Sequence, residues 1–385
     1  MGSITVPQEV PPSLKRPWIE TPLVHSRPLS NAAGCNIYLK LENLQPSGSF
    51  KSRGIGNMMS RAILSTSSPD QPVHFYCSSS GNAGLACATT ALKLSTPSTR
   101  HRVTIAVNTA AAKGSPATMA KLRSLGAEVV VAGASWAESD AHMREVVMKE
   151  NAVSGEKQIY VPPFDHPDIW EGAATVVDEI VAQMGTEVNG GIDAIVCNVG
   201  GGGLLNGVME GLQRYYTPNM SMPMPKVLAV ETIGADSLNA SVKAGELVRL
   251  PGITSIATSL GATQVSEKTW EWARRYCHLG GTGEQSTGSE KERGKMISTT
   301  VTDAEAAMAA VRFLDDARIM VEVACGATIA MAYNGGLRKH LGGDGLSDEE
   351  WANVNVVLVV CGGSNVTFDI LNGYKERFGG EGSFV

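Results

Sequence analysis

Short apolar or β-branched runs alternate with helix-type patterns along most of the chain. Runs of five or six such residues are typical of buried parallel strands, and they occur at 73–77, 102–107, 127–131, 194–199, 227–231 and 356–360. Between them, apolar residues recur at helical spacing over 82–94, 116–125, 136–149 and 204–215. This alternation predicts an α/β protein with doubly wound sheets. Residues 1–30 lack either pattern and are expected to form a loosely structured arm.

The size and charge of the chain narrow the classes of function. With 385 residues it is long enough for two domains. A net charge of −6 and a pI near 5.7 give no support for nucleic acid or an anionic membrane as a partner. No apolar stretch reaches the ~18 residues of a membrane span, and the first residues lack the pattern of a secretory signal. We therefore expect a cytoplasmic protein with no membrane partner.

The cysteines and histidines do not form a recognisable metal or disulfide pattern. The chain has seven cysteines, an odd number, and no Cys-x-x-Cys pair. Its seven histidines do not fall beside them at zinc-site spacing. Reduced, mostly buried thiols are the expected state, which agrees with a cytoplasmic location.

Lys51 lies in a loop that suggests covalent chemistry. The segment from Pro46 to Gly54 holds one proline, two glycines and three serines around this lysine, a composition typical of a tight loop. An apolar-patterned stretch precedes the loop, and a helix is predicted over 56–64. A lysine in such a turn can hold a carbonyl cofactor as a Schiff base where burial disfavours its charged form. The alternative is an ordinary solvated lysine.

A run of four glycines gives the second signal. Gly200, Gly201, Gly202 and Gly203 stand between a predicted buried strand and a helix that starts with Leu204. Residues without side chains allow backbone N–H groups to approach an anion, and the start of a helix adds positive potential. The spacing is not that of a dinucleotide-binding Gly-x-Gly-x-x-Gly motif, and no Gly-Lys-Ser/Thr follows. The run therefore indicates a phosphate-binding loop, with a plain Gly-rich turn as the alternative.

Two further motifs stand at the ends of predicted strands. Ser78-Ser79-Ser80-Gly81-Asn82 separates a strand from a helix, where hydroxyls and amides can bind a carboxylate or simply cap the helix. Cys361 begins a Gly turn after the last strand. Ligands of open α/β sheets bind at the carboxyl ends of strands. A Schiff-base lysine, a phosphate loop, a carboxylate loop and a polar strand end together indicate a pyridoxal 5'-phosphate site.

In this order and spacing, the motifs resemble the fold-type II pyridoxal-phosphate enzymes, which have a tryptophan synthase β-like fold. The similarity extends from about Thr21 to Tyr374 and includes 160–165, 169–172 and 321–327. The sequence Ser-Gly-Asn-Ala-Gly at 80–84 is most similar to the L-serine dehydratase, or L-serine/L-threonine ammonia-lyase, branch. The resemblance implies two doubly wound α/β domains with the cofactor between them. It implies a large cofactor-binding domain of 1–55 plus 156–385 and a small substrate-binding domain of 56–155.

The resemblance also implies roles for individual residues. Lys51 would form the Schiff base and remove the substrate Cα proton. The remaining cofactor contacts would come from Phe50 beside the ring, Asn82 at its 3′-oxygen, the phosphate loop Gly200, Gly201, Gly202, Gly203 and Leu204, and Cys361 at the pyridine nitrogen. The substrate carboxylate would be held by Ser79, Ser80, Gly81 and Asn82. A neutral thiol at Cys361 cannot keep the pyridine nitrogen protonated, which favours β-elimination over long-lived carbanion chemistry.

The reaction implied is an α,β-elimination in which the β-hydroxyl leaves, and hydrolysis then gives pyruvate and ammonia from L-serine and 2-oxobutyrate and ammonia from L-threonine. Two residues depart from the branch. Ser80 stands where many L-serine dehydratases have Ala or Gly, and where the similar serine racemases have an acid/base Ser. Ser80 is therefore a second candidate catalytic residue, with carboxylate binding as its alternative role. Ser259 stands where a small apolar residue usually covers the ring.

The resemblance further implies a cation and a dimer. Glu231 and Ala235 match a site for a monovalent or divalent cation near the phosphate loop, although Glu231 could equally be a paired structural acid. A homodimer is expected from the family alone. The alternative functions are a serine racemase or D-serine-active relative, a β-replacement enzyme of the cysteine synthase type, and a non-catalytic pyridoxal-phosphate protein.

Overall fold

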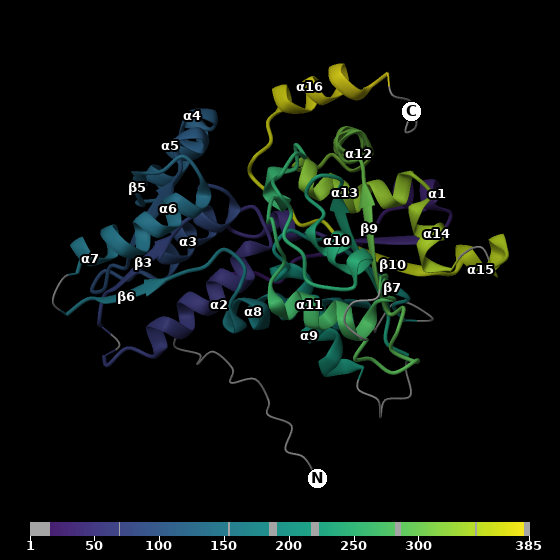
Figure 1. The fold of residues 1–385 in the computed structure, drawn as a ribbon, viewed down its shortest axis with the longest axis horizontal. Coiled ribbons are helices and arrows are strands. Elements are labelled where there is room, and N and C mark those ends of the chain that lie inside the picture. The colour runs from purple at the N-terminus through teal and green to yellow at the C-terminus, as the bar shows by residue number, and fades with distance from the viewer. Residues whose placement is uncertain are drawn as a thin grey trace, which may run out of the picture. The chain divides into compact units, whose positions relative to one another are not determined.

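The chain folds into two compact units, which are described separately. The computed structural model describes residues 16–68, 70–152, 155–184, 191–216, 223–281, 286–342 and 345–380. Unit 1 comprises Met1–Ile19 with Lys51–Pro163, and unit 2 comprises Glu20–Phe50 with Phe164–Val385 (Figure 1). The chain therefore passes from one unit to the other after Ile19, Phe50 and Pro163. The domain boundaries predicted from the sequence stay a prediction.

Unit 1 is built on a four-stranded parallel sheet. Its strands lie in the order β5 (Glu128–Val131), β4 (Arg102–Val107), β3 (Val73–Cys77) and β6 (Lys157–Tyr160). Every residue of the central strand β3 is buried, as expected for a parallel strand covered on both faces. The helices are α2 (Lys51–Leu64), α3 (Asn82–Leu94), α4 (Thr109–Gly114), α5 (Pro116–Ser124), α6 (Trp136–His142) and α7 (Met148–Glu150), with a π-helical turn at Met143–Val147.

Unit 2 is built on a six-stranded sheet. The strands lie in the order β1 (Leu23–His25), β2 (Asn36–Lys40), β10 (Asn355–Val359), β7 (Ala194–Asn198), β8 (Lys226–Thr232) and β9 (Met296–Val301). Only the edge pair β1–β2 is antiparallel among the described strands. From β7 the chain proceeds to β8 and β9 on one side, whereas β10 returns to the other side of β7. The strand order therefore reverses between β7 and β10, the position where open α/β sheets bind ligands.

The helices of unit 2 cover this sheet and complete its core. They are α1 (Arg27–Ala33), α8 (Pro167–Met184), α9 (Gly203–Tyr215), α10 (Ser237–Ala244), α11 (Glu267–Tyr276), α12 (Asp303–Ala317), α13 (Val323–Tyr333), α14 (Gly336–Leu341), α15 (Asp348–Ala352) and α16 (Phe368–Phe378), with 3-10 turns η1 (Glu42–Leu44) and η3 (Thr258–Leu260). Helix α13 is buried at almost every position and packs on β7 and β8. The predicted doubly wound α/β fold is confirmed.

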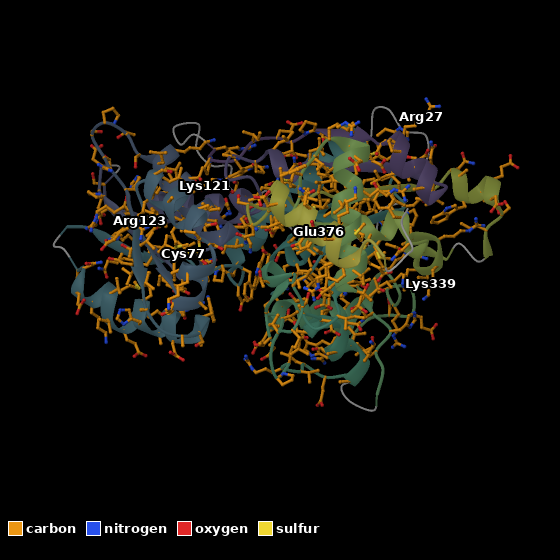
Figure 2. The ribbon with its side chains drawn as sticks, turned by 90° about the horizontal axis from the view of Figure 1, so that it is seen from above. Arg27, Cys77, Lys121, Arg123, Lys339 and Glu376 are labelled. Carbon is orange, nitrogen blue, oxygen red and sulfur yellow. The ribbon has the colours of Figure 1, made fainter. Side chains whose placement is uncertain are left out.

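Three expectations about individual segments can be compared with the fold. The prediction of a loosely structured arm is wrong for 23–30, where β1 pairs with β2 and helix α1 begins. The sequence pattern did not reveal this edge strand because it is only three residues long and shows no clear alternation of apolar and polar residues. Residues 1–15 lie outside the described part. The seven cysteines are all free and buried, as predicted, including Cys77 at the end of β3 (Figure 2). No helix in the described part is both long and apolar enough to cross a membrane.

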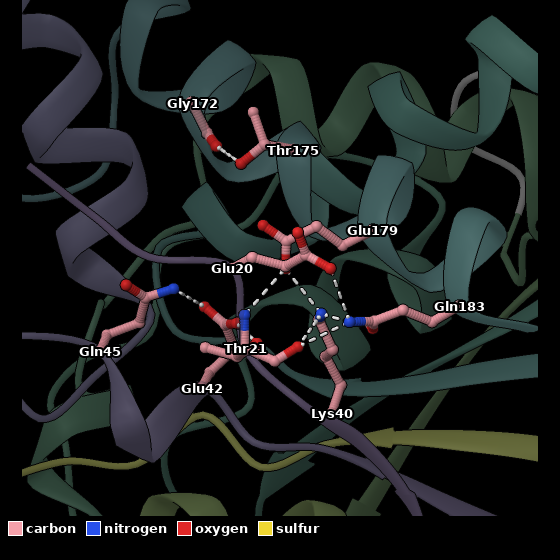
Figure 3. A network of polar contacts seen from close by, with 9 residues as sticks. All are labelled: Glu20, Thr21, Lys40, Glu42, Gln45, Gly172, Thr175, Glu179 and Gln183. Carbon is pink, nitrogen blue, oxygen red and sulfur yellow. Dashed lines mark hydrogen bonds and ion pairs between the residues drawn. The ribbon is translucent and has the colours of Figure 1, made fainter. Parts of the chain in front are cut away.

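A buried lysine joins three segments of unit 2. Lys40 ends β2 and is fully buried. Its Nζ donates to Glu179 Oε2 at 2.6 Å, to the Thr21 carbonyl at 2.7 Å and to Gln183 Oε1 at 2.9 Å (Figure 3). Thr21 Oγ1 in turn donates to Glu42 Oε1 at 2.6 Å. A buried ammonium is tolerated only with such partners. The network therefore ties the segment at 20–22, β2 and turn η1 to helix α8.

Replacing Lys40 with Met should destabilise the protein. The apolar side chain removes the ammonium that pairs with the mostly buried Glu179 carboxylate at 2.6 Å, and breaking a buried pair from one side costs about 3 kcal/mol of unfolding free energy. Urea denaturation measures this loss. Lys268→Met is the matched control, because its partner Glu271 is largely exposed and such pairs contribute less than about 1 kcal/mol. Equal stability losses in the two variants would contradict a structural role for the Lys40 network.

Candidate active site

In unit 1, Lys51 is placed at the carboxyl end of the sheet. It is the first residue of α2 and is partly buried. Its Nζ donates to the carbonyl of Pro163 at 2.6 Å. Pro163 follows strand β6, whose neighbour β3 runs parallel to it. The amine of Lys51 therefore lies at the edge where both strands end, the edge at which parallel sheets bind ligands.

The serine loop lies at the same edge. Ser78 is buried directly after β3, and Ser79, Ser80, Gly81 and Asn82 are partly exposed as the chain enters α3. The N-cap of α3 is Gly81, which has no side chain with which to cap the helix, and the first turn of α3 holds no acidic residue. The first-turn N–H groups of α3 therefore favour an anionic ligand such as a carboxylate.

In unit 2, the glycine loop is shaped by its neighbours. A Cβ at Gly201 would lie 2.3 Å from the ring of Phe164, and one at Gly202 would lie 1.8 Å from Thr269 Oγ1. Gly202 also has a φ of +99°, which L side chains rarely adopt. The Ser266 N–H donates to the Gly201 carbonyl at 3.0 Å. The run of glycines is thus required by close packing within the protein itself.

The same loop opens helix α9 in a way that fits a phosphate group. Gly202 is the N-cap of α9 and has no side chain with which to cap the helix, and no acid occupies the first turn. The N–H groups of Gly203 and Leu204 therefore head a 13-residue helix whose dipole favours an anion. Gly200 to Leu204 are buried or nearly so, which strengthens such an interaction.

Cys361 lies beside this loop at the strand reversal. It follows β10 and is buried, and Asn198 Nδ2, at the end of the neighbouring strand β7, donates to its sulfur at 3.2 Å. The Phe50 N–H donates to the Cys361 carbonyl at 3.1 Å. A hydrogen bond with Cys325, together with burial, raises the pKa of the Cys361 thiol well above its ordinary value. Cys361 is therefore a neutral thiol.

Glu231 is used as a helix cap. It is fully buried in β8, and its two carboxylate oxygens accept the N–H groups of Leu238 at 2.9 Å and Asn239 at 2.7 Å, at the start of α10. Burial raises the pKa of this carboxyl to about 8, although the two backbone donors oppose the shift. Ala235 is buried close by, where its N–H donates to the Thr232 carbonyl at 2.9 Å. The described residues contain no group of three or more His, Cys, Asp or Glu placed for a metal.

The predicted residues are thus gathered within each unit. Lys51 and the serine loop share one edge in unit 1, and the glycine loop, Cys361 and Phe50 share another in unit 2. The carbonyl of Ser259 also lies against this loop, 3.3 Å from where a Cβ of Gly200 would be. Sequence reasoning missed three residues that shape these edges, namely Phe164, Asn198 and Trp136. Asn198 carried a usable signal, because a polar residue ends an apolar strand immediately before the glycines.

Comparison with known proteins gives a consistent result. The model of the pyridoxal-phosphate dependent enzyme family matches residues 14–362. The catabolic L-serine/threonine dehydratase of Saccharomyces cerevisiae is 37% identical over 87% of this chain and 84% of its own length. The L-serine dehydratase/L-threonine deaminase of Bos taurus is 39% identical over 94% of this chain and 97% of its own.

Solved structures agree on the fold. A fungal L-serine ammonia-lyase from Rhizomucor miehei superposes with a TM-score of 0.76 and 32% identity, covering 94% of this chain and all of that one. A serine racemase from Dictyostelium discoideum has a TM-score of 0.66 at 24% identity, covering 91% of this chain and 94% of its own, a likeness of fold alone. The match over most of the chain shows that this protein belongs to the family of pyridoxal-phosphate dependent enzymes.

Proposed function

We propose that this protein is an L-serine/L-threonine dehydratase, a lyase that converts L-serine to pyruvate and ammonia and L-threonine to 2-oxobutyrate and ammonia by α,β-elimination. The observation that carries the proposal is its identity of 37% and 39% to two serine/threonine dehydratases, over 84% and 97% of their lengths. The placement of Lys51 and the serine loop at one sheet edge supports it. So does the helix start at Gly203, which can bind an anion.

Lys51 has the central role in this proposal. Pyridoxal phosphate, when bound, supplies an aldehyde for a Schiff base and a ring that accepts electrons from the Cα–H bond. The Lys51 amine would hold that aldehyde and, once the substrate amine has replaced it, would accept the Cα proton, while the β-hydroxyl leaves as water and ammonia is released by hydrolysis of the product. The Pro163 carbonyl accepts a hydrogen bond from Nζ at 2.6 Å and so holds the side chain in one direction.

The loops divide the remaining binding between them. We assign the substrate carboxylate to Ser79, Ser80, Gly81 and Asn82, whose backbone heads helix α3, and the cofactor 3′-oxygen to the amide of Asn82. The cofactor phosphate is assigned to the glycine loop from Gly200 to Leu204.

The cofactor ring is assigned to two further residues. Phe50 flanks the ring, and the neutral thiol of Cys361 faces its nitrogen. A neutral partner leaves the ring a weaker electron sink than a carboxylate would, which favours elimination.

Ser80 supports a second candidate activity. Ser80 is partly exposed in the serine loop, two residues before the start of α3. A hydroxyl there can either help bind the carboxylate or exchange a proton with the substrate. The second role would give the enzyme serine racemase or D-serine dehydratase activity in addition to its action on L-serine.

We further propose a cation at Glu231 and Ala235, a homodimer and a cytoplasmic location. A carboxylate and a backbone carbonyl are suitable ligands for a hard cation. A bound cation would favour the ionised form of Glu231, which burial alone disfavours. The predicted domains, 1–55 plus 156–385 and 56–155, belong to the same proposal.

The substitution Lys51→Ala should abolish the elimination. Without the amine, both the Schiff base and the proton acceptor are lost, so turnover should fall by about a thousandfold or more. A purified-enzyme assay that follows 2-oxo acid and cofactor absorbance with L-serine, L-threonine and D-serine measures this. Lys113→Ala, on the partly exposed helix α4, is the control. If the wild-type enzyme holds the cofactor but forms no 2-oxo acid, the dehydratase assignment is wrong. Chiral analysis of the serine would then separate racemase from replacement chemistry.

The substitution Gly202→Ala should weaken cofactor binding. An alanine at a φ of +99° is strained and would also displace Thr269. The loop must then move away from its phosphate-binding geometry, and we expect cofactor affinity to fall about tenfold or more. Titration of the apoenzyme with pyridoxal phosphate measures it. Gly373→Ala is the matched control, since its Cβ meets nothing within 4 Å. Unchanged affinity in Gly202→Ala would remove this loop from the site.

A cation that binds at Glu231 should increase the free energy of unfolding of the protein. After treatment with EDTA, adding K⁺, Na⁺, Mg²⁺ or Ca²⁺ separately should stabilise the wild type, by about 3 kcal/mol at a hundred times Kd. Glu231→Gln keeps the size of the side chain but loses the charge and one of the two oxygens that accept the N–H groups of Leu238 and Asn239, so it should show no such gain. If wild type and variant respond identically to all four ions, Glu231 is only a helix cap.

A further inference from the structure

Trp136 is an exposed aromatic residue with one specific contact in unit 1. It begins helix α6, and 49% of the residue is accessible to solvent. Its indole Nε1 nevertheless donates a hydrogen bond of 2.6 Å to the carbonyl of Ser78, 58 residues earlier in the chain. Ser78 is the buried first residue of the serine loop. The contact therefore connects the start of helix α6 to the loop that follows β3.

The turn that carries Trp136 is itself firmly held. Ser135 Oγ accepts the N–H of Glu138 at 3.2 Å, and Glu138 Oε2 accepts the N–H of Ala134 at 2.9 Å. The Gly133 carbonyl accepts the N–H of Thr109 at 3.0 Å. Such a reciprocal arrangement of cap and backbone fixes the direction in which α6 leaves the sheet. The indole is thus presented to Ser78 from a rigid support.

The serine loop is held from a second side by its own helix. A Cβ on Gly84 would lie only 1.9 Å from the Ser79 carbonyl. The loop backbone therefore rests directly on α3, where only glycine leaves enough space. The Ser78 hydroxyl is buried and has no hydrogen-bond partner among the described residues. The backbone contacts to Trp136 and Gly84, rather than the Ser78 side chain, define the course of the loop.

The indole bond also sets the direction of a neighbouring N–H group. The Ser78 carbonyl and the Ser79 N–H belong to one planar trans peptide and point in opposite directions. A carbonyl held by Trp136 therefore aims the Ser79 N–H away from the indole. We infer that Trp136 is a positioning residue that orients the serine loop for the carboxylate of an amino-acid substrate. This inference rests on the function proposed for that loop.

The role predicts an effect on binding rather than on the chemical step. The substrate carboxylate does not react, so the loop holds it equally in the ground state and the transition state, and its loss raises KM while leaving kcat unchanged. Trp136→Phe removes the indole N–H and keeps an aromatic ring. Loss of one such hydrogen bond should raise KM for both L-serine and L-threonine about 3- to 10-fold, with kcat within about twofold.

A matched control separates positioning from general stability. Trp351 is buried in α15 of unit 2, and its Nε1 donates to the Ala33 carbonyl at 2.8 Å. Trp351→Phe therefore loses an equivalent indole-to-carbonyl bond away from the serine loop. It should lower the melting temperature and leave KM unchanged. Cofactor content, measured by absorbance, should equal that of the wild type in both variants.

Gly84→Ala tests the same loop independently of the tryptophan. Its new methyl group must push the Ser79 carbonyl away, so KM should rise at least as much as in Trp136→Phe. The dissociation constant of L-alanine, which has the carboxylate but no leaving group, is measured through cofactor absorbance in each holoenzyme. Weaker L-alanine binding in Trp136→Phe supports positioning. Unchanged L-alanine binding, or a fall in kcat at constant KM, overturns it. If the wild-type enzyme binds L-alanine but forms no 2-oxo acid from L-serine or L-threonine, the result overturns the dehydratase function itself.

Discussion

Parallel strand pairing is the constraint on which the candidate chemistry of both units depends. Parallel strands that are covered on both faces must be apolar, so the polar groups collect where the strands end. In unit 1 this edge receives Lys51 and the serine loop. In unit 2 it receives the glycine loop and Cys361, at the point where the strand order reverses between β7 and β10. The backbone amides that begin α3 and α9 supply positive potential at these edges without any charged side chain.

Burial affects ionisable groups differently in the Lys40 network and near the candidate ligand-binding loops. Lys40 keeps its buried ammonium because a carboxylate, a carbonyl and an amide oxygen surround it. Near the ligand loops, burial instead favours neutral forms. Burial raises the pKa of the Glu231 carboxyl to about 8. It also contributes to the raised pKa that keeps Cys361 a neutral thiol. If the cofactor ring nitrogen faces Cys361 as proposed, a neutral thiol gives it no charge, which would favour elimination over carbanion chemistry.

Glycine has two separate reasons to occur in the glycine loop before α9. The sequence suggests a backbone that approaches an anion. The structure adds that Phe164 and Thr269 already occupy the space where side chains of Gly201 and Gly202 would be. The rigid packing that excludes those side chains also fixes the direction of the helix-start amides. Binding geometry and packing are therefore satisfied by the same residues, as expected where a site must be preorganised.

The sequence alone determined the strand–helix alternation, the loops at strand ends and the type of cofactor, because periodicity, turn residues and motif spacing are local properties. Lys51, the serine loop and the glycine run could be singled out for that reason. Only the tertiary structure decided that Trp136 supports Ser78, that Asn198 contacts Cys361 163 residues away, and that 23–30 are ordered against β2. These contacts join segments far apart in the chain, and no local pattern records which distant residue will fill a given space or satisfy a given carbonyl.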